Sequence, residues 1–144
     1  MNWKEISEKY PKAFNKFFKW YWPNERQSFD GNDLYFCQTV GDENYAECSI
    51  PYESFCEIRK FYDFFDEQEI FIEIEFYPIP ESPKKPWTCN GTIFEGNDLH
   101  LKWCSEEYIK RSDAEEATFM KAFEILEKEL NKKHGNKIKK NKKQ

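Results

Sequence analysis

The sequence predicts an α+β fold in which helices pack on one face of a mostly antiparallel sheet of about five strands. Apolar residues recur at helical spacing near both ends of the chain, and they alternate with polar residues over 69–77. The connections between these segments are short, which favours antiparallel pairing of neighbouring strands. Aromatic residues make up 19% of the 144 residues, so we expect much of the core to be aromatic.

Three regions carry helical periodicity. The N-terminal apolar stripe contains Pro11, which cannot donate a backbone hydrogen bond, so we expect one helix over residues 3–9 and a second from Pro11 to about Trp22. Proline also suits the first position of a helix, and we expect a middle helix over residues 51–66. A final helix over residues 112–130 begins with a serine that can cap it.

Five segments have the composition of strands. In the most regular one, the isoleucines at 70, 72 and 74 and the phenylalanine at 76 face one way, which places an acidic face on the other side. Gly96-Asn97 is typical of a two-residue hairpin turn, which would pair Phe94 with Leu99 and Cys89 with Cys104. The predicted strands are residues 33–39, 45–50, 69–77, 87–94 and 99–104.

The charge is divided unevenly along the chain. Residues 1–131 contain 27 Asp and Glu against 15 Lys and Arg, a net charge of −12, whereas residues 132–144 contain seven Lys and no acid. The sum of the two parts is the net charge of −5. The sequence therefore predicts a single acidic domain over residues 1–131, followed by a Lys-rich, disordered tail over residues 132–144.

No residue pattern predicts an active site or a metal site. Cys89, His100 and Cys104 resemble zinc ligands in type, but four strand residues place His100 and Cys104 about 13 Å apart. Zinc requires ligand atoms about 2.0–2.3 Å from one point. No nucleophile–histidine signature and no phosphate-binding glycine loop occurs either. The sequence thus favours a protein that is not an enzyme and that uses no metal or cofactor.

The number and spacing of the cysteines indicate the cellular compartment in which the protein is expected. The five cysteines form no CxxC pair, and no signal-like segment precedes Trp3. No apolar run approaches the roughly 18 residues that a membrane helix needs. We therefore expect a soluble cytoplasmic protein with reduced thiols.

The acidic strand face suggests a site for a protein partner. Carboxylates and aromatic side chains share this face, and aromatic anchors within a charged rim are typical of protein interfaces. Its two central carboxylates, at i and i+2, lie about 7 Å apart in a strand. A glycosidase-like acid–base pair is the alternative use of such carboxylates. The predicted partner-binding residues are Glu69, Phe71, Glu73, Glu75 and Tyr77.

The basic tail suggests an alternative, a protein associated with nucleic acid. Lysines can bind phosphates without reading bases, and the tail contains neither arginine nor aromatic residues. The residues that would bind are Lys132, Lys133, Lys137, Lys139, Lys140, Lys142 and Lys143. An enzyme of a type that the sequence does not identify is a third possibility.

Three segments carry a resemblance to other proteins: 2–14, beginning Asn-Trp-Lys-Glu-Ile; 61–74, containing Phe-Tyr-Asp-Phe-Phe-Asp-Glu; and 114–127, beginning Ala-Glu-Glu-Ala. Together they resemble small uncharacterised proteins of gut bacteria and their phages. These segments are the predicted helices and central strand, so the resemblance supports the fold. It carries no activity or site residues, and it implies an accessory or host-interfering role by analogy only.

Overall fold

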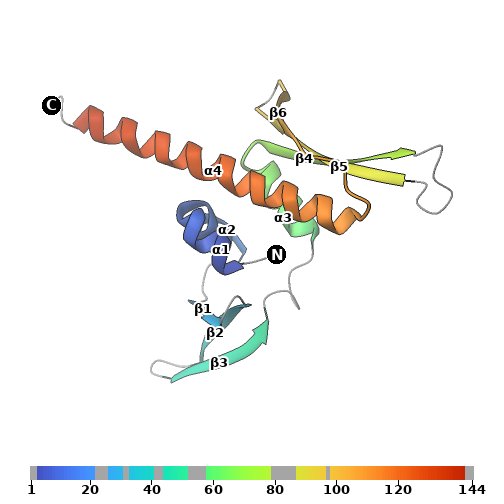
Figure 1. Cartoon of the computed structure of the whole chain (residues 1–144). Coiled ribbons are helices and arrows are strands. Elements are labelled where there is room, and N and C mark those ends of the chain that lie inside the picture. Colours follow the sequence, from blue (N-terminus) through green and yellow to red (C-terminus); the bar gives the residue numbers. More distant parts are fainter. Residues whose placement is uncertain are drawn as a thin grey trace. The chain divides into compact units, whose positions relative to one another are not determined.

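In a computed structural model, the chain forms helices and strands in the order shown in Figure 1. The structure describes residues 3–21, 26–30, 33–40, 44–51, 58–78, 87–96 and 98–141, with side chains described over 3–21, 58–78, 87–96 and 98–134. The elements are α1 (Trp3–Lys9), α2 (Pro11–Tyr21), β1 (Arg26–Asp30), β2 (Asp33–Val40), β3 (Asn44–Pro51), α3 (Arg59–Asp66), β4 (Ile70–Pro78), β5 (Trp87–Glu95), β6 (His100–Cys104) and α4 (Arg111–Asn141).

The α+β class and the antiparallel pairing are confirmed, but the single sheet of about five strands is wrong. The six described strands form two three-stranded sheets, β1-β2-β3 and β4-β5-β6. In each sheet every strand pairs with its neighbour in sequence, so local pairing accounts for both sheets. The sixth strand, β1, pairs antiparallel with β2, and Asp30 lies opposite Asp33 in this pairing.

The chain divides into two compact units. Residues 1–60 and 123–144 form the first unit, and residues 61–122 form the second. The predicted domain of residues 1–131 therefore spans both units. By sequence, the first unit has 13 Asp and Glu against 16 Lys and Arg, a net charge of +3. The second unit has 14 Asp and Glu against six Lys and Arg, a net charge of −8.

An aromatic cluster forms the described core of the first unit. The break predicted at Pro11 is present, since α1 ends at Lys9 and α2 begins at Pro11. The ring of Phe17 stacks on Trp3 at 6.1 Å and meets the edge of Phe123 at 5.8 Å. Burying such rings is the largest favourable contribution to packing here. The buried residues of α1 and α2 are Trp3, Ile6, Ala13, Phe14, Phe17 and Phe18.

A carboxylate from α4 caps the N-terminus of α2. Tyr10 precedes α2 and its backbone carbonyl accepts the first helical hydrogen bond, but its long, rigid side chain cannot fold back to accept one from the first-turn N–H groups. Glu127, which is 8% exposed, supplies the missing acceptor: the N–H of Ala13 donates to its Oε2 at 2.8 Å. The Asn131 side chain donates to the other oxygen at 3.3 Å. The cap therefore joins α2 to α4.

Replacing Glu127 with alanine should lower the free energy of unfolding by about 1–2 kcal/mol, because a buried first-turn N–H loses its acceptor. Urea denaturation followed by circular dichroism measures the loss. The matched control is Glu129→Ala, which makes the same change two residues further along α4 and should cost less than about 0.5 kcal/mol. Equal losses in the two variants would contradict the capping role.

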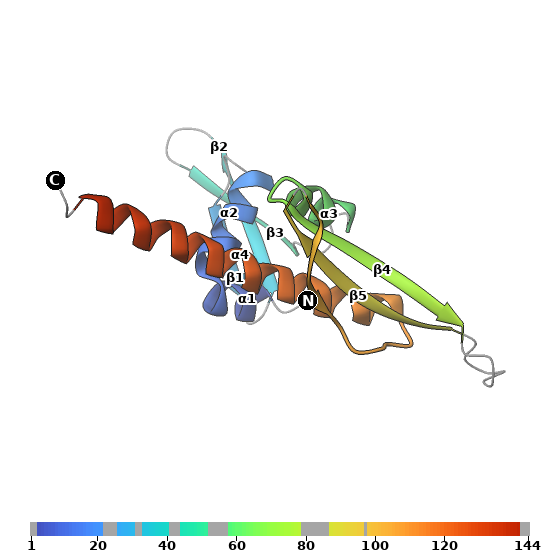
Figure 2. The same cartoon turned by 90° about the horizontal axis from the view of Figure 1, so that it is seen from above.

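The core of the second unit is built from α3, the first part of α4, and β4 and β5. Figures 1 and 2 both show β4 and β5 side by side. Phe119 of α4 is at the centre, with ring centroids of Phe61 and Phe65 of α3 at 4.9 and 6.3 Å. The helix also approaches the sheet closely at Gly91, where an added Cβ would lie 1.7 Å from Thr118 Oγ1. Only a glycine permits this approach.

Several predicted boundaries differ from the observed ones. Pro51 does not open a helix, because it is the last residue of β3. β3 is an edge strand, and proline is tolerated in an edge strand because it lacks an N–H group that a central strand would need for pairing. The middle helix begins at Arg59, and residues 52–57 of the prediction lie outside the described residues. The last helix continues to Asn141, so most of the segment expected to be disordered is helical.

The predicted hairpin register is also wrong. Phe94 pairs with Leu101 rather than Leu99, because the turn contains four residues and not two. Gly96 and Leu99 both take positive φ angles, of 75° and 50°, which gives the longer turn its shape. Cys89 and Cys104 therefore do not face each other, and both are free thiols.

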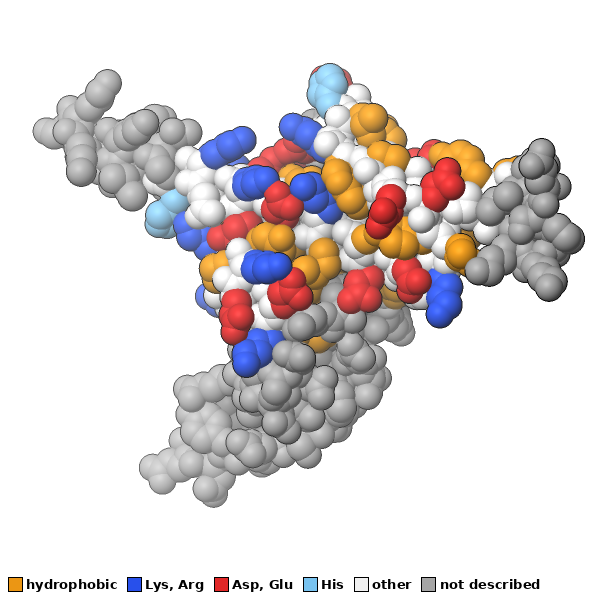
Figure 3. Space-filling model, viewed as in Figure 1, with side chains coloured by type: hydrophobic (Ala, Val, Ile, Leu, Met, Phe, Trp, Pro, Cys, Tyr) orange, Lys and Arg blue, Asp and Glu red, His pale blue; other side chains and the backbone are white. Residues whose placement is uncertain are grey.

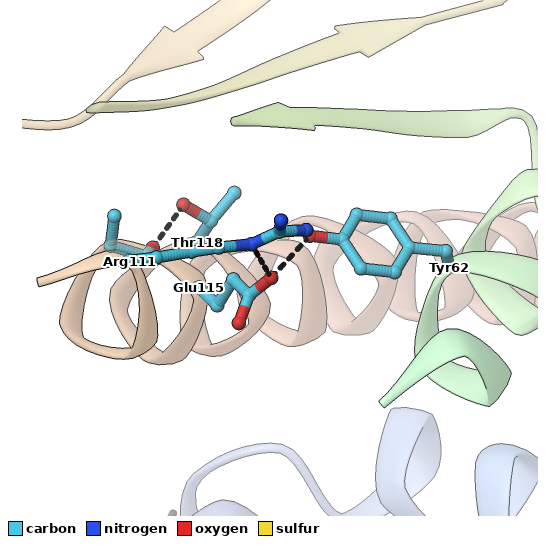
Figure 4. A network of polar contacts seen from close by, with 5 residues as sticks. Tyr62, Arg111, Glu115 and Thr118 are labelled. Atoms are coloured by element: carbon cyan, nitrogen blue, oxygen red, sulfur yellow. Dashed lines mark hydrogen bonds and ion pairs between the residues drawn. The ribbon is translucent and has the colours of Figure 1, made fainter. Parts of the chain in front are cut away.

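A polar network joins α3 to α4 (Figure 4). Glu115 is 6% exposed, and its Oε1 accepts hydrogen bonds from the Tyr62 hydroxyl at 3.1 Å and from Arg111 Nε at 2.7 Å. The Arg111 guanidinium also lies 6.0 Å from the ring centre of Phe76 on β4. Burial and then the Glu115 carboxylate raise the pKa of Tyr62 to about 12. The network is structural, since the carboxylate is held by groups of its own chain.

The stability that Tyr62 contributes should depend on pH. Because its folded-state pKa is raised from 10.0 to about 12, this contribution is complete below pH 10 and is lost as the pH rises toward 12. The wild-type chain should therefore exceed Tyr62→Phe in free energy of unfolding at about pH 8, and the difference should shrink by about pH 11. Urea denaturation of both chains measures it, and a difference that does not change with pH would contradict the assignment.

Candidate functional site

One face of β4 carries four of the five residues that the sequence assigns to a partner. Phe71, Glu73, Glu75 and Tyr77 alternate along β4 and share this face, which we call the acidic face. Phe71 is half-buried, both glutamates are exposed, and Tyr77 is 42% exposed. The Tyr77 hydroxyl donates a hydrogen bond to Glu75, and this bond raises the pKa of Tyr77 above its usual value of 10.0.

The neighbouring strand adds polar groups to the acidic face. In the β4–β5 register, Thr92 is opposite Glu73, and Asn90 is opposite Glu75. The Asn90 amide and the Thr92 hydroxyl both point to the thiol of Cys104 on β6, at 3.1 and 3.9 Å. These neighbours bring no positive charge beside the glutamates.

The two glutamates lack a cationic partner among the described side chains. Ion pairs among the described side chains of the second unit use other carboxylates, such as Glu95 with Lys102 and Glu115 with Arg111. The unit around the acidic face has a net charge of −8. Figure 3 shows red carboxylates among orange hydrophobic side chains over the region of β4 and β5. The surface can therefore attract a positively charged segment.

β4 is an edge strand of its sheet. The strand order is β4-β5-β6, and no other described strand pairs with the free side of β4. A free edge presents backbone N–H and C=O groups, and charged side chains along such an edge discourage unselective pairing. A partner with complementary charge is not repelled by these glutamates. The acidic face and the free edge together can therefore select a basic extended segment.

Two residues of the predicted strand 69–77 differ from their predicted positions. Glu69 is not in β4, because it takes a φ of 59° in the turn before the strand, where its carbonyl accepts from Gly96. Phe76, predicted to face the core, is 50% exposed on the opposite side from the acidic face. Ile70 and Ile72 of the same series are buried as predicted. The core side of β4 is therefore covered at its beginning and exposed toward its end.

The lysines of the alternative site are only partly described. Lys132 and Lys133 are exposed on α4. The backbone of Lys137, Lys139 and Lys140 is helical, but their side chains lie outside the described part, as do the whole of Lys142 and Lys143.

A basic groove that the sequence did not reveal lies between α2 and α4. It has a volume of about 410 Å³, and no Asp or Glu is among the described residues that line it. Leu130 and His134 contribute from α4, and Lys12, Asn15, Lys16 and Lys19 contribute from α2. The sequence does contain a pattern that indicates a basic helix face, because the charged residues of α2 are all lysines spaced at i, i+4 and i+7.

The described residues hold neither a cluster of metal ligands nor a membrane-spanning helix. No group of three or more His, Cys, Asp or Glu side chains there could hold a metal ion. The thiol of Cys89 is buried, and burial raises its pKa, whereas Cys104 is exposed. Within the same part of the chain, none of the helices has the length and apolar character that crossing a membrane requires.

Comparisons with known proteins add no family. No protein-family model, curated protein or solved structure matches the chain.

Proposed function

We propose that this chain is a non-enzymatic accessory protein that binds a basic, extended segment of a protein partner through the acidic face of β4. The observation that carries the proposal is the pair Glu73 and Glu75, exposed on one face without a cation beside them among the described side chains. A basic segment would relieve the repulsion between these carboxylates and speed the encounter.

The geometry favours an extended partner. Residues two apart in a strand lie about 7 Å apart, so lysines at alternate positions of an extended peptide match the spacing of the two glutamates. The free edge of β4 can supply backbone hydrogen bonds, and Tyr77 offers an exposed aromatic surface at the end of the row. The resemblance to proteins of gut bacteria and their phages is consistent with a host-directed accessory role.

A labelled peptide of alternating lysine and valine tests this function. Fluorescence anisotropy should detect binding of this peptide to the wild-type chain. A matched peptide of alternating glutamate and valine should not bind. Glu73→Gln/Glu75→Gln should weaken binding by about tenfold or more, because both charge contacts are lost.

The control removes the same charge elsewhere in the second unit. Asp98→Asn/Glu107→Gln replaces two exposed carboxylates that lie off the acidic face. This variant should keep nearly the full affinity for the lysine–valine peptide. Equal weakening of the two variants would mean that only net charge attracts the peptide, and the proposal would then fail.

A further inference from the structure

We infer that the groove between α2 and α4 binds the phosphate backbone of a nucleic acid, without selecting its sequence. The inference concerns the first unit, and it does not depend on the acidic face in the second. A row of lysines, a described lining that has no carboxylate, and the net charge of +3 of the unit support it.

The lysines form a row along one side of α2. Lys12, Lys16 and Lys19 are exposed and line the groove. Seven residues of helix extend about 10 Å at a rise of 1.5 Å each. One strand of a B-form duplex places a phosphate about every 3.4 Å along its axis, so the row covers about three phosphates. A linear polyanion therefore fits the row better than a single small anion.

The opposite buried face of α2 holds this row in place. Phe14, Phe17 and Phe18 are buried, so the helix cannot rotate its lysines away from the groove. Glu127 lies near the start of α2, but its Oε2 accepts the N–H of Ala13 inside the structure. Lys12 donates to the neutral Oδ1 of Asn131 across the two helices. These two contacts hold α2 and α4 in position on either side of the groove.

The α4 side continues the basic surface. His134 lines the groove one turn after Leu130, and Lys132 and Lys133 are exposed on the same helix. The described lining contains no arginine and no aromatic side chain, which are the groups that read or stack on bases. Leu130 is the one apolar residue of the described lining, and a single leucine is too little to anchor a membrane. The ligand chemistry is thus phosphate on an extended polymer.

The test compares three variants of the full chain with the wild type, using a labelled oligonucleotide of mixed sequence. Lys12→Gln/Lys16→Gln/Lys19→Gln removes the row, and Lys4→Gln/Lys60→Gln/Lys110→Gln removes the same charge from other exposed positions. The third variant replaces with glutamine the five lysines that follow His134: Lys137, Lys139, Lys140, Lys142 and Lys143.

The row variant should lose about 100-fold in affinity at low salt, and the slope of log K against log salt should fall by about 2–3, roughly one for each lysine. The control should change much less, and oligonucleotides of different sequence should bind wild type equally. Circular dichroism checks that each variant is folded.

Three results would overturn the inference: no oligonucleotide binding by wild type, equal losses in the row variant and the control, or binding lost only in the variant of the last five lysines. Two further probes are vesicles that contain phosphatidylserine and, separately, inorganic phosphate in solution. Row-dependent binding of either one, without binding of the oligonucleotide, would also overturn it.

Discussion

Replacing Phe119 with alanine should destabilise the protein by about 3–5 kcal/mol, the largest effect that we expect from a single substitution. Phe119 is 1% exposed, and its ring contacts Phe61 and Phe65 as well as the edge of Tyr62, whose centroid is 5.1 Å away. Alanine would leave a cavity among these rings, and three ring contacts would be lost with it. Such a loss is a large share of the roughly 5–15 kcal/mol that stabilises a typical domain.

Urea denaturation followed by tryptophan fluorescence measures this effect. Leu101→Ala is the control, since Leu101 is 63% exposed on β6 and should change the free energy of unfolding by less than about 0.5 kcal/mol. A loss below about 1 kcal/mol for Phe119→Ala would show that this ring is not central to the core.

Replacing Gly91 with alanine should cost about 2–3 kcal/mol, because the new methyl group has no room. The added Cβ would lie 1.7 Å from Thr118 Oγ1 and 2.9 Å from Thr118 Cβ. The hydroxyl cannot turn aside freely, since it donates a buried hydrogen bond to the carbonyl of Ala114 at 2.6 Å. Either α4 moves away from β5 or the hydrogen bond breaks.

A double-mutant cycle isolates this contact. Thr118→Ala removes the hydroxyl and methyl groups that the new Cβ would meet, so Gly91→Ala should cost about 1 kcal/mol less in the Thr118→Ala background than in wild type. Gly96→Ala is a useful contrast, because nothing lies within 4 Å of its added Cβ and only the φ of 75° opposes the change. A Gly91→Ala cost that is the same in both backgrounds would contradict the close approach of α4 to β5.

The sequence predicted the local elements better than their assembly. Alternation along residues 69–77 correctly placed Ile70 and Ile72 in the core, and Pro11 correctly divided the N-terminal helices. Alternation alone cannot show how far a covering helix extends, and so Phe76 was expected in the core although it is half-exposed beside Arg111. The division into two sheets depends on which strands meet, and no residue pattern reports that choice.

The sequence also predicted local features of the candidate sites better than those that depend on the assembly of distant segments. The acidic face was visible because β-strand alternation places Glu73 and Glu75 together, and the structure keeps both exposed. Glu69 belongs to a turn instead, because its positive φ allows Gly96 to donate to its carbonyl. The basic groove was missed because two helices distant in sequence build it, and the pairing of Lys12 with Asn131 becomes evident only in the folded chain.

We propose that the acidic face of β4 receives a basic extended segment. The most direct measurement is a heteronuclear NMR titration of the full chain with the lysine–valine peptide, which reports the backbone amide of each residue. We predict shift changes concentrated on β4 from Phe71 to Tyr77 and on the facing residues of β5, with the amides of α2 unchanged. Changes spread evenly over exposed carboxylates, or confined to another surface, would contradict the claim.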